Sequence, residues 1–193
     1  MTTAALDTRF YRRVIGQFAT GVTVILAEEG DEVHGMTANA VTSLSLDPLL
    51  LIVCVDKRAH MAERLQRAHT FTVNVLRDDQ EAVSGYFAGG ARRGMARPEF
   101  HFVPWGSAPR LSGCLAALAC DVHEILEGGD HWIVIGRVTA LYEGPPPYAP
   151  LLYFGGRYRT LRPGDADPAP ELAAGPIPIH IFYDEWVDDM QED

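Results

Sequence analysis

A run of small hydroxyl and amide side chains has the residue types that could bind a phosphate group or a heterocyclic ring. The run covers residues 35–48 and includes Thr37, Asn39, Thr42 and Ser43. Small side chains let a ligand approach the backbone, and hydroxyl and N–H groups can hold phosphate oxygens or ring heteroatoms. Because the run is too polar for a buried strand and lacks a helical apolar period, we expect a loop between strands, a place where binding sites tend to lie. A solvated Ser/Thr turn would have the same composition, so the residues alone leave both readings open.

Three arginines in a glycine-rich segment are a second candidate for binding an anion. Arg92, Arg93 and Arg97 lie within residues 89–98, which show neither helical nor strand periodicity and predict an irregular segment. A solvated surface loop is the alternative to an anion site, and the sequence does not decide between them.

Motifs for side-chain catalysis and for metal binding are absent from the sequence. It contains no nucleophile elbow, no Walker loop and no His-Glu-x-x-His run. Cys54, Cys114 and Cys120 stand in apolar stretches without a Cys/His cluster of metal-site spacing. They are expected to be small buried residues rather than disulfides, thiol catalysts or metal ligands. Such a chain is typical of proteins in which a bound cofactor carries the chemistry.

The elements that must position these candidates are mostly short strands. Residues 49–55 are apolar at every position and predict a central strand, whereas residues 71–76 alternate and predict a half-buried one. Many short strands, few flanking helices and frequent turn residues predict a mainly β fold, a Greek-key-like antiparallel barrel. The other expected strands are 22–26, 33–37, 115–122, 132–141 and 151–154, and helices are expected from Asp7 or Thr8, from Ala59 and from Asp78 or Asp79.

Length and charge limit the possible partners. The chain has 193 residues, enough for one domain with a sizeable core, and a formal net charge of −10. The charge argues against sequence-independent binding of nucleic acid. No run reaches the ~20 apolar residues that span a bilayer, and the first residues lack the features of a signal peptide. We therefore expect a cytoplasmic protein with no membrane span.

The composition changes near Arg162. Residues 162–193 are rich in Pro and Gly and end in the acidic run 184–193. We therefore expect a domain over residues 1–161, followed by a C-terminal extension over residues 162–193.

Several segments, taken in order, resemble the short-chain flavin reductases. These proteins have an FMN-binding split β-barrel fold and act as the reductase components of two-component flavin-dependent monooxygenases. The resemblance covers roughly residues 10–161. One departure is that the family often has two prolines after its Ser-x-Ser turn, whereas this chain has only Pro48. The segments that carry the resemblance are 21–24, 34–39, 43–49, 71–76, 129–138 and 150–158.

The resemblance implies a set of binding residues in this chain. Those at the start of the polar run would line the flavin: Met36, Thr37, Ala38 and Asn39. Those that would hold the ribityl chain and phosphate follow: Thr42, Ser43, Cys54, Val55, Asp56 and Lys57. His131 would help to place the nicotinamide, and no residue is assigned as a catalytic acid or base. Phe154 and Tyr158, with Tyr153, would face either cofactor, or else belong to the core.

The same resemblance implies an activity. Hydride would pass from NADH or NADPH to FMN or FAD, with the protein supplying proximity and alignment. Reduced flavin would then serve a separate monooxygenase, and the reductase would be a homodimer. Two alternatives remain: a split-barrel flavoprotein that retains FMN and acts on another substrate, and a non-enzymatic flavin- or haem-binding protein. The Gly129-Asp130-His131 segment favours the reductase, because a pure binding protein needs no nicotinamide site.

Overall fold

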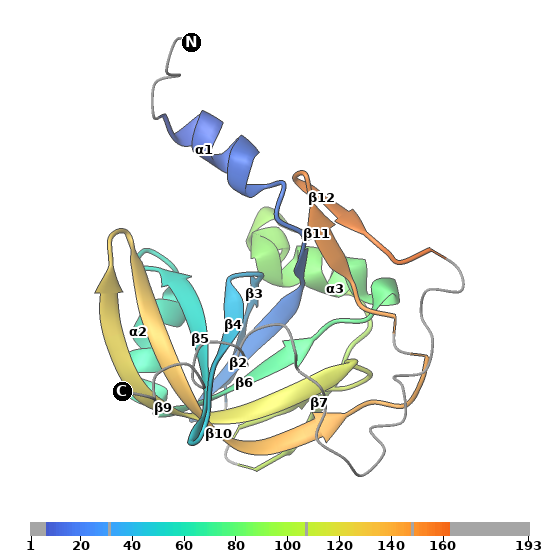
Figure 1. The fold of residues 1–193 in the computed structure, drawn as a ribbon. Coiled ribbons are helices and arrows are strands. Elements are labelled where there is room, and N and C mark those ends of the chain that lie inside the picture. The colour runs from blue at the N-terminus through green and yellow to red at the C-terminus, as the bar shows by residue number, and fades with distance from the viewer. Residues whose placement is uncertain (1–6, 31, 107, 148, 163–193) are drawn as a thin grey trace, which may run out of the picture.

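The structure, a computed structural model, describes residues 7–30, 32–106, 108–147 and 149–162, with the exception of the Arg92 side chain. Its main element is one antiparallel sheet of seven strands in the order β3-β2-β6-β9-β10-β5-β4 (Figure 1). The fold is therefore mainly β with few helices, as the sequence predicts. The strands of this sheet are β2 (Thr23–Glu29), β3 (Glu32–Ala38), β4 (Val41–Leu46), β5 (Leu49–Asp56), β6 (Thr70–Val75), β9 (Ala116–Gly128) and β10 (His131–Glu143).

The sheet curls into a barrel because its two edge strands are consecutive in the chain. Only Asn39 and Ala40 separate β3 from β4, yet β3 pairs with β2 and β4 pairs with β5. The Cys54 N–H donates to the Ala40 carbonyl over 3.0 Å and fastens this crossing to β5. Beyond it, the described strands show no ladder between β3 and β5. The barrel is therefore closed at the crossing and split on the side where β3 leaves β5.

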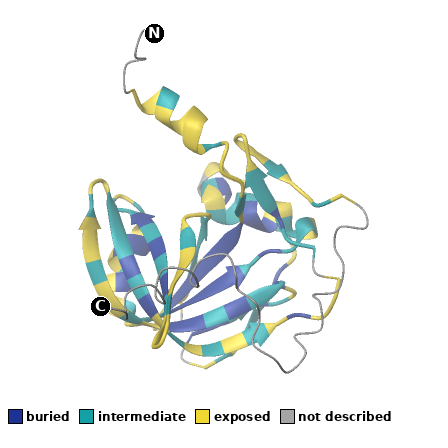
Figure 2. Cartoon of the chain, in the orientation of Figure 1, coloured by how far each residue is buried: buried dark blue, intermediate teal, exposed yellow. Residues whose placement is uncertain are grey.

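The core lies on both faces of β2. Ile25 and Ala27 belong to one cluster, inside the barrel, with Val53 and Phe71. The residues that alternate with them, Val24 and Leu26, belong to a second cluster on the other face of β2. This second cluster also contains Leu76, Leu111 and Leu151. Because successive side chains of a strand point to opposite faces, burial of both sets places β2 between the two clusters (Figure 2).

Strand β6 is buried more completely than its sequence pattern predicts. The alternation in residues 71–76 predicts one exposed face, but Thr72 and Asn74 are fully buried together with their apolar neighbours. Their polar groups are satisfied from other elements: the Thr72 hydroxyl donates to the Pro109 carbonyl, and the Asn74 amide bonds the backbone of Val24 and Leu111. These bonds remove the cost of burying polar side chains.

The helices and small sheets surround the barrel. Helix α2 covers it through Met61 and Leu65, as the sequence predicts, and helix α1 extends away from it with no buried residue (Figure 1). The Asp7 side chain caps α1 by accepting from the N–H groups of Arg9 and Phe10. The remaining elements are α1 (Thr8–Ile15), α2 (His60–Ala68), η1 (Asp78–Gln80), α3 (Glu81–Gly85), η2 (Tyr86–Gly90), η3 (Ala91–Arg93), β1 (Thr20–Gly21), β7 (Phe102–Val103), β8 (Arg110–Leu111), β11 (Leu152–Phe154) and β12 (Arg157–Arg159).

Two segments differ from the expected loops. Residues 35–48 are not a loop, because most of them belong to β3 and β4 and only short connections lie outside the strands. Edge strands tolerate polar side chains, so polarity gives a false sign of a loop here. The segment 89–98 begins with the helical turns η2 and η3 before it becomes irregular. The extension predicted from residue 162 lies outside the described residues from 163 onward.

The packing of β10 on β6 gives a prediction about stability. A Cβ atom on Gly136 would lie 2.6 Å from the Phe71 ring and 3.0 Å from the Cys120 Cβ. We expect Gly136→Ala to lower the free energy of unfolding by about 1–3 kcal/mol, because the buried sheet has no room for a methyl group. Urea unfolding measures this change. Gly21→Ala is the matched control, since nothing lies within 4 Å of the added atom, and an equal effect of both substitutions would contradict the packing argument.

Candidate functional site

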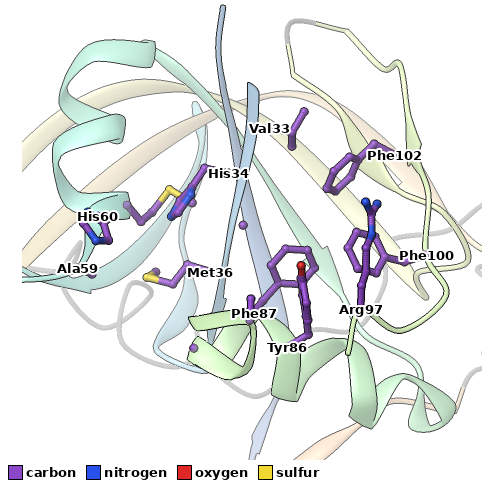
Figure 3. Close-up of a pocket in the computed structure, with 14 residues that line it drawn as sticks. Val33, His34, Met36, Ala59, His60, Tyr86, Phe87, Arg97, Phe100 and Phe102 are labelled. Atoms are coloured by element: carbon purple, nitrogen blue, oxygen red, sulfur yellow. The ribbon is translucent and has the colours of Figure 1, made fainter. Parts of the chain in front are cut away.

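A hollow of about 290 Å³ lies in the split of the barrel (Figure 3). Strand β3 forms its floor, the start of α2 lies on one side, and α3 with its following turns lies on the other. The lining is rich in aromatic rings and carries basic or titratable nitrogen groups. Its residues are Val33, His34, Gly35, Met36, Ala59, His60, Met61, Tyr86, Phe87, Gly89, Ala91, Arg97, Phe100 and Phe102.

A second, more open hollow of about 540 Å³ adjoins the first. Met36, Phe87 and Gly89 line both, so the two form one continuous surface along β3. The second hollow adds Thr37 and Arg93. The sequence predicts that Met36 and Thr37 line a flavin; Met36 lies where the two hollows meet, and Thr37 lies in the second.

The Phe87 ring packs directly on the backbone of Gly35. A Cβ atom at this position would collide with the ring carbons of Phe87. Glycine therefore lets the ring lie against β3, where it forms part of both hollows. The sequence contains Gly35 within its polar run, but a glycine there carries no signal that an aromatic ring from a remote helix will cover it.

Hydrogen bonds connect the end of β3 to elements far away in the sequence. The Thr37 hydroxyl donates to the Ser84 carbonyl over 2.7 Å, and the Ser84 hydroxyl lies 2.8 Å from the Tyr158 hydroxyl. The Asn39 amide donates to the Thr20 hydroxyl over 3.1 Å. Thr37 and Tyr158 are therefore held in place by protein contacts, and their positions are fixed before any ligand arrives.

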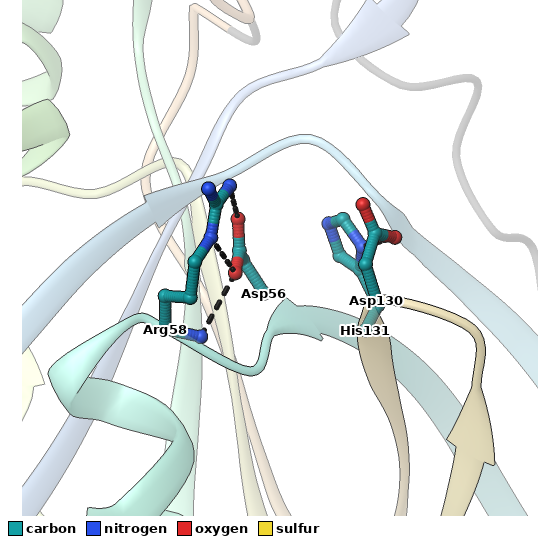
Figure 4. A network of polar contacts seen from close by, with 4 residues as sticks. All are labelled: Asp56, Arg58, Asp130 and His131. Atoms are coloured by element: carbon teal, nitrogen blue, oxygen red, sulfur yellow. Dashed lines mark hydrogen bonds and ion pairs between the residues drawn. The ribbon is translucent and has the colours of Figure 1, made fainter.

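A polar group at the end of β5 contains His131 (Figure 4). Asp56 and His131 are direct partners across β5 and β10, and the His131 Nδ1 atom lies 2.7 Å from an oxygen of Asp130. Arg58 donates to Asp56 from its side chain and from its backbone N–H. The Arg58 hydrogen bonds hold the pKa of Asp56 well below its usual range, and the bond to His131 lowers the pKa of Asp130.

Lys57 points to a different set of groups. Its Nζ atom lies 2.9 Å from an oxygen of Glu127 and 4.5 Å from the centre of the Trp132 ring. A phosphate role for Lys57 would require this ammonium to leave or to share Glu127. The ion pair also lowers the pKa of Glu127, through the hydrogen bond from Lys57.

The other predicted residues occupy varied positions. Thr42 and Ser43 are exposed on β4, whereas Val55 is fully buried in the core, so its side chain cannot touch a ligand from outside. Phe154 is exposed on β11, and the Tyr153 and Tyr158 rings pack together at 5.6 Å. Ala38 lies at the end of β3, where its carbonyl accepts from Thr23.

Cys54 is half-buried on β5, and Cys114 and Cys120 are buried. Burial raises the pKa of the Cys114 thiol and outweighs the opposite effect of a hydrogen bond from Arg110. Burial raises the pKa of the Cys120 thiol to about 12. Within the described ranges, His, Cys, Asp and Glu side chains form no group of three that could hold a metal ion. None of the described helices has the length and apolarity needed to cross a membrane.

The aromatic and histidine lining was not predicted from the sequence. His60, Phe87 and Phe100 come from separate segments, and each also reads as an ordinary helix or core residue. The one available signal was the arginine-rich segment, which provides Arg93 and Arg97 to the two hollows.

The family pattern of the flavin reductase like domain matches residues 15–162, which include every strand of the barrel. The chain belongs to the flavin reductase-like family. This confirms the resemblance drawn from the sequence, and the split-barrel fold with it.

Two curated members of the family have similar sequences. The reductase component of 4-hydroxyphenylacetate 3-monooxygenase from Thermus thermophilus is 43% identical over 154 residues, which are 78% of this chain and 95% of that protein. An NADH-dependent FAD reductase from Streptomyces globisporus is 42% identical over 161 residues, 81% of this chain and 86% of that protein.

Solved structures of the family have the same fold. The NADH:FAD oxidoreductase SgcE6 of Streptomyces globisporus, in complex with NAD and FAD fragments, matches with a TM-score of 0.75 and 37% identity, over 86% of this chain and 99% of that one. The flavin reductase PheA2 matches with a TM-score of 0.74 and 38% identity, over 81% of this chain and 99% of that one.

The Asp56–Arg58 contact gives a prediction about titration. We expect Arg58→Ala to raise the pKa of Asp56 towards its ordinary value, because both the side-chain hydrogen bonds and the positive charge are lost. Carbon-detected NMR of the carboxyl group across acidic pH measures it. Since the pKa of Asp56 is lower in the folded than in the unfolded state, its stabilising effect exists at neutral pH and disappears as the pH falls through the folded-state pKa.

A neighbouring ion pair provides the control for this titration. Lys57→Ala should raise the pKa of Glu127 and leave that of Asp56 low. An Asp56 pKa that stays low in Arg58→Ala would show that another group holds the carboxylate.

Proposed function

We propose that this flavin reductase-like protein is an NADH-dependent flavin reductase that supplies reduced flavin to a separate monooxygenase. Three predicted binding segments meet at one rim of the barrel, and this convergence carries the proposal. Ala40 is bonded to Cys54, Asp56 pairs with His131, and the Lys57 N–H donates to the Asp130 carbonyl. Family members named as an NADH-dependent FAD reductase and as a monooxygenase reductase component support the same activity.

The rim has groups that fit a flavin. Strand β3 pairs with β2 on one side only, so every second residue directs its N–H and C=O groups towards the split. These donors and acceptors match the polar edge of an isoalloxazine ring. The small side chain of Ala38 leaves room beside the backbone at the end of β3. The side chains that would line the ring are those of Met36, Thr37 and Asn39.

His131 is the candidate for placing the nicotinamide. It is half-buried at the start of β10, and the contact between its Nδ1 atom and Asp130 leaves its Nε2 atom available to a ligand. If Nδ1–H donates a hydrogen bond to Asp130, the Nε2 atom of the neutral ring can accept one from a ligand. The contact with Asp130 also orients the imidazole.

A bound flavin would supply the atom that accepts hydride, and the chain would supply position. Thr37 and Tyr158, held through Ser84, keep the end of β3 rigid, and the barrel wall excludes water from one face of the ligand. None of these residues has to act as a strong acid or base. The rate enhancement would come from holding two ring systems in contact.

The activity is tested by following NADH absorbance at 340 nm with FAD, FMN and riboflavin. We expect flavin-dependent oxidation of NADH and release of reduced flavin. Absence of NADH consumption with all three flavins would contradict the reductase, and turnover by a flavin that never leaves the protein would favour the flavoenzyme that retains FMN.

A substitution tests the role of His131. We expect His131→Ala to raise the KM for NADH by about tenfold, which corresponds to the loss of one contact worth about 1.4 kcal/mol, with little change in the KM for flavin. His123→Ala is the matched control, because His123 is exposed on β9 and lines neither hollow. An unchanged KM for NADH in His131→Ala would exclude the nicotinamide role.

The homodimer is part of the same proposal, and helix α1 supports it. Apolar side chains of α1 and of Phe18, just after it, are largely exposed in the described chain, at 67% for Tyr11, 55% for Val14 and 71% for Phe18. Large exposed apolar surface of this kind is typical of an interface. A second copy of the chain would cover it.

Light scattering coupled to size-exclusion chromatography tests the dimer. We expect a dimer for the wild type and a monomer for the double substitution Val14→Ser and Phe18→Ser, because the shared apolar surface is lost. Leu141→Ser is the control, since Leu141 is equally exposed but lies on β10, away from α1. A monomeric wild type would overturn the proposed dimer.

A further inference from the structure

The aromatic hollow, of about 290 Å³, is lined by nitrogen groups and, in the described chain, by no acid. Its residues include Arg97, His34 and His60 and, among the described side chains, no Asp or Glu. The adjoining hollow likewise has Arg93 and no acid. A surface with basic side chains and no carboxylate favours an anionic ligand.

Among the described residues, two arginines of the hollows have no carboxylate partner. Neither Arg93 nor Arg97 forms an ion pair within the described ranges, whereas four other basic side chains do: Lys57, Arg58, Arg64 and Arg67. Arg93 lies against Gly89, and Arg97 lies over the Phe100 ring at 4.4 Å. Both guanidinium groups therefore keep their N–H donors for a ligand, and paired arginines suit a diphosphate.

The ligand must also offer a flat apolar group. The rings of Tyr86, Phe87, Phe100 and Phe102 form one cluster with centre-to-centre distances between 5.0 and 5.7 Å. In Figure 3 these rings and the Arg97 guanidinium stand together on one side of the hollow, opposite His34 and His60. Purine bases stack on aromatic faces and on guanidinium planes, so this side of the hollow suits a purine.

The position of the hollow connects it to the proposed flavin rim. Met36, Phe87 and Gly89 are shared by both hollows, and Thr37 marks the side on which the flavin ring would lie. A ligand that extends from this rim first passes Arg93 and then reaches Arg97 and the aromatic cluster. Along this surface, a ligand would therefore place first its ring system, then its anionic group and finally its flat apolar group.

We propose that the aromatic hollow binds an adenosine diphosphate group, with the diphosphate at Arg93 and Arg97 and the adenine against the aromatic cluster. FAD and NADH both carry this group, and FMN does not. The proposal rests on the proposed reductase function for its choice of ligands. Under this proposal, Arg93 and Arg97 determine either the preference for FAD over FMN or the affinity for NADH. Both arginines lie outside the segments that carry the family resemblance.

Direct binding of ADP is the first test, because it does not depend on activity. Isothermal titration of the full-length protein with ADP should give binding that weakens by about tenfold or more in Arg97→Ala and is largely kept in Arg97→Lys. Arg137→Ala is the matched control, since this exposed arginine on β10 lines neither hollow. No binding of ADP to the wild type, or equal loss in both alanine variants, would overturn the proposal.

Steady-state kinetics then identify the source of the group. If FAD provides it, Arg97→Ala raises the KM for FAD by about tenfold and leaves that for FMN unchanged. If NADH provides it, the KM for NADH rises with either flavin. Unchanged constants for all three would overturn the proposal. A wild type that consumes no NADH with any of the flavins would contradict the proposed function and leave the ADP titration to decide this one. Arg97 is exposed, so the variants should keep the wild-type melting temperature.

Discussion

One backbone crossing determines the shape of the site. The chain passes from one edge of the sheet to the other through Asn39 and Ala40, and the hydrogen bond between the Cys54 N–H and the Ala40 carbonyl fixes that passage. A sheet closed by a two-residue link at one end cannot also be paired at the other when its edge strands diverge. The open half of the barrel is therefore a consequence of the closed half, and the proposed ligand surface lies where pairing stops.

The split exposes one side of a strand whose other side is paired. An unpaired edge normally invites aggregation, and proteins usually cover it. Here Phe87, seated on Gly35, and the start of α2 border the edge without pairing with it. The edge is thus shielded from other chains by its position inside a hollow, while its N–H and C=O groups stay open to a small molecule. The geometry that protects the edge would also serve the proposed binding of a ligand.

The sequence predicted the strands and the helix α2 more accurately than the contacts that their residues make. The β-branched runs gave the strands of the barrel, and Met61 and Leu65, four residues apart, gave the buried face of α2. The polar run 35–48 was misread because an edge strand gains its stability from backbone pairing, which side-chain polarity does not report. Strand β6 was misread because Thr72 and Asn74 find their partners on remote segments.

The site was predictable only in part for the same reason. Family resemblance pointed to Met36, Thr37 and His131, and the barrel brings their segments to one rim, although their contacts with cofactors remain predictions. Lys57 lies with Glu127 and Trp132, and Val55 faces the core, because neighbours in space decide where each side chain points. The aromatic hollow draws on four separated segments, so no local pattern reveals it: 33–36, 59–61, 86–91 and 97–102.

The bonded series Thr37, Ser84 and Tyr158 connects two distant parts of the fold. Thr37 belongs to β3 beside the split, and Tyr158 belongs to β12, which pairs with β11. A displacement of β12 would therefore change the position of β3, where the flavin is proposed to bind. Helix α1 is joined to the β11–β12 turn by the bond from the Gly155 N–H to the Gly16 carbonyl, so a molecule that holds α1 would act on the split through this small sheet.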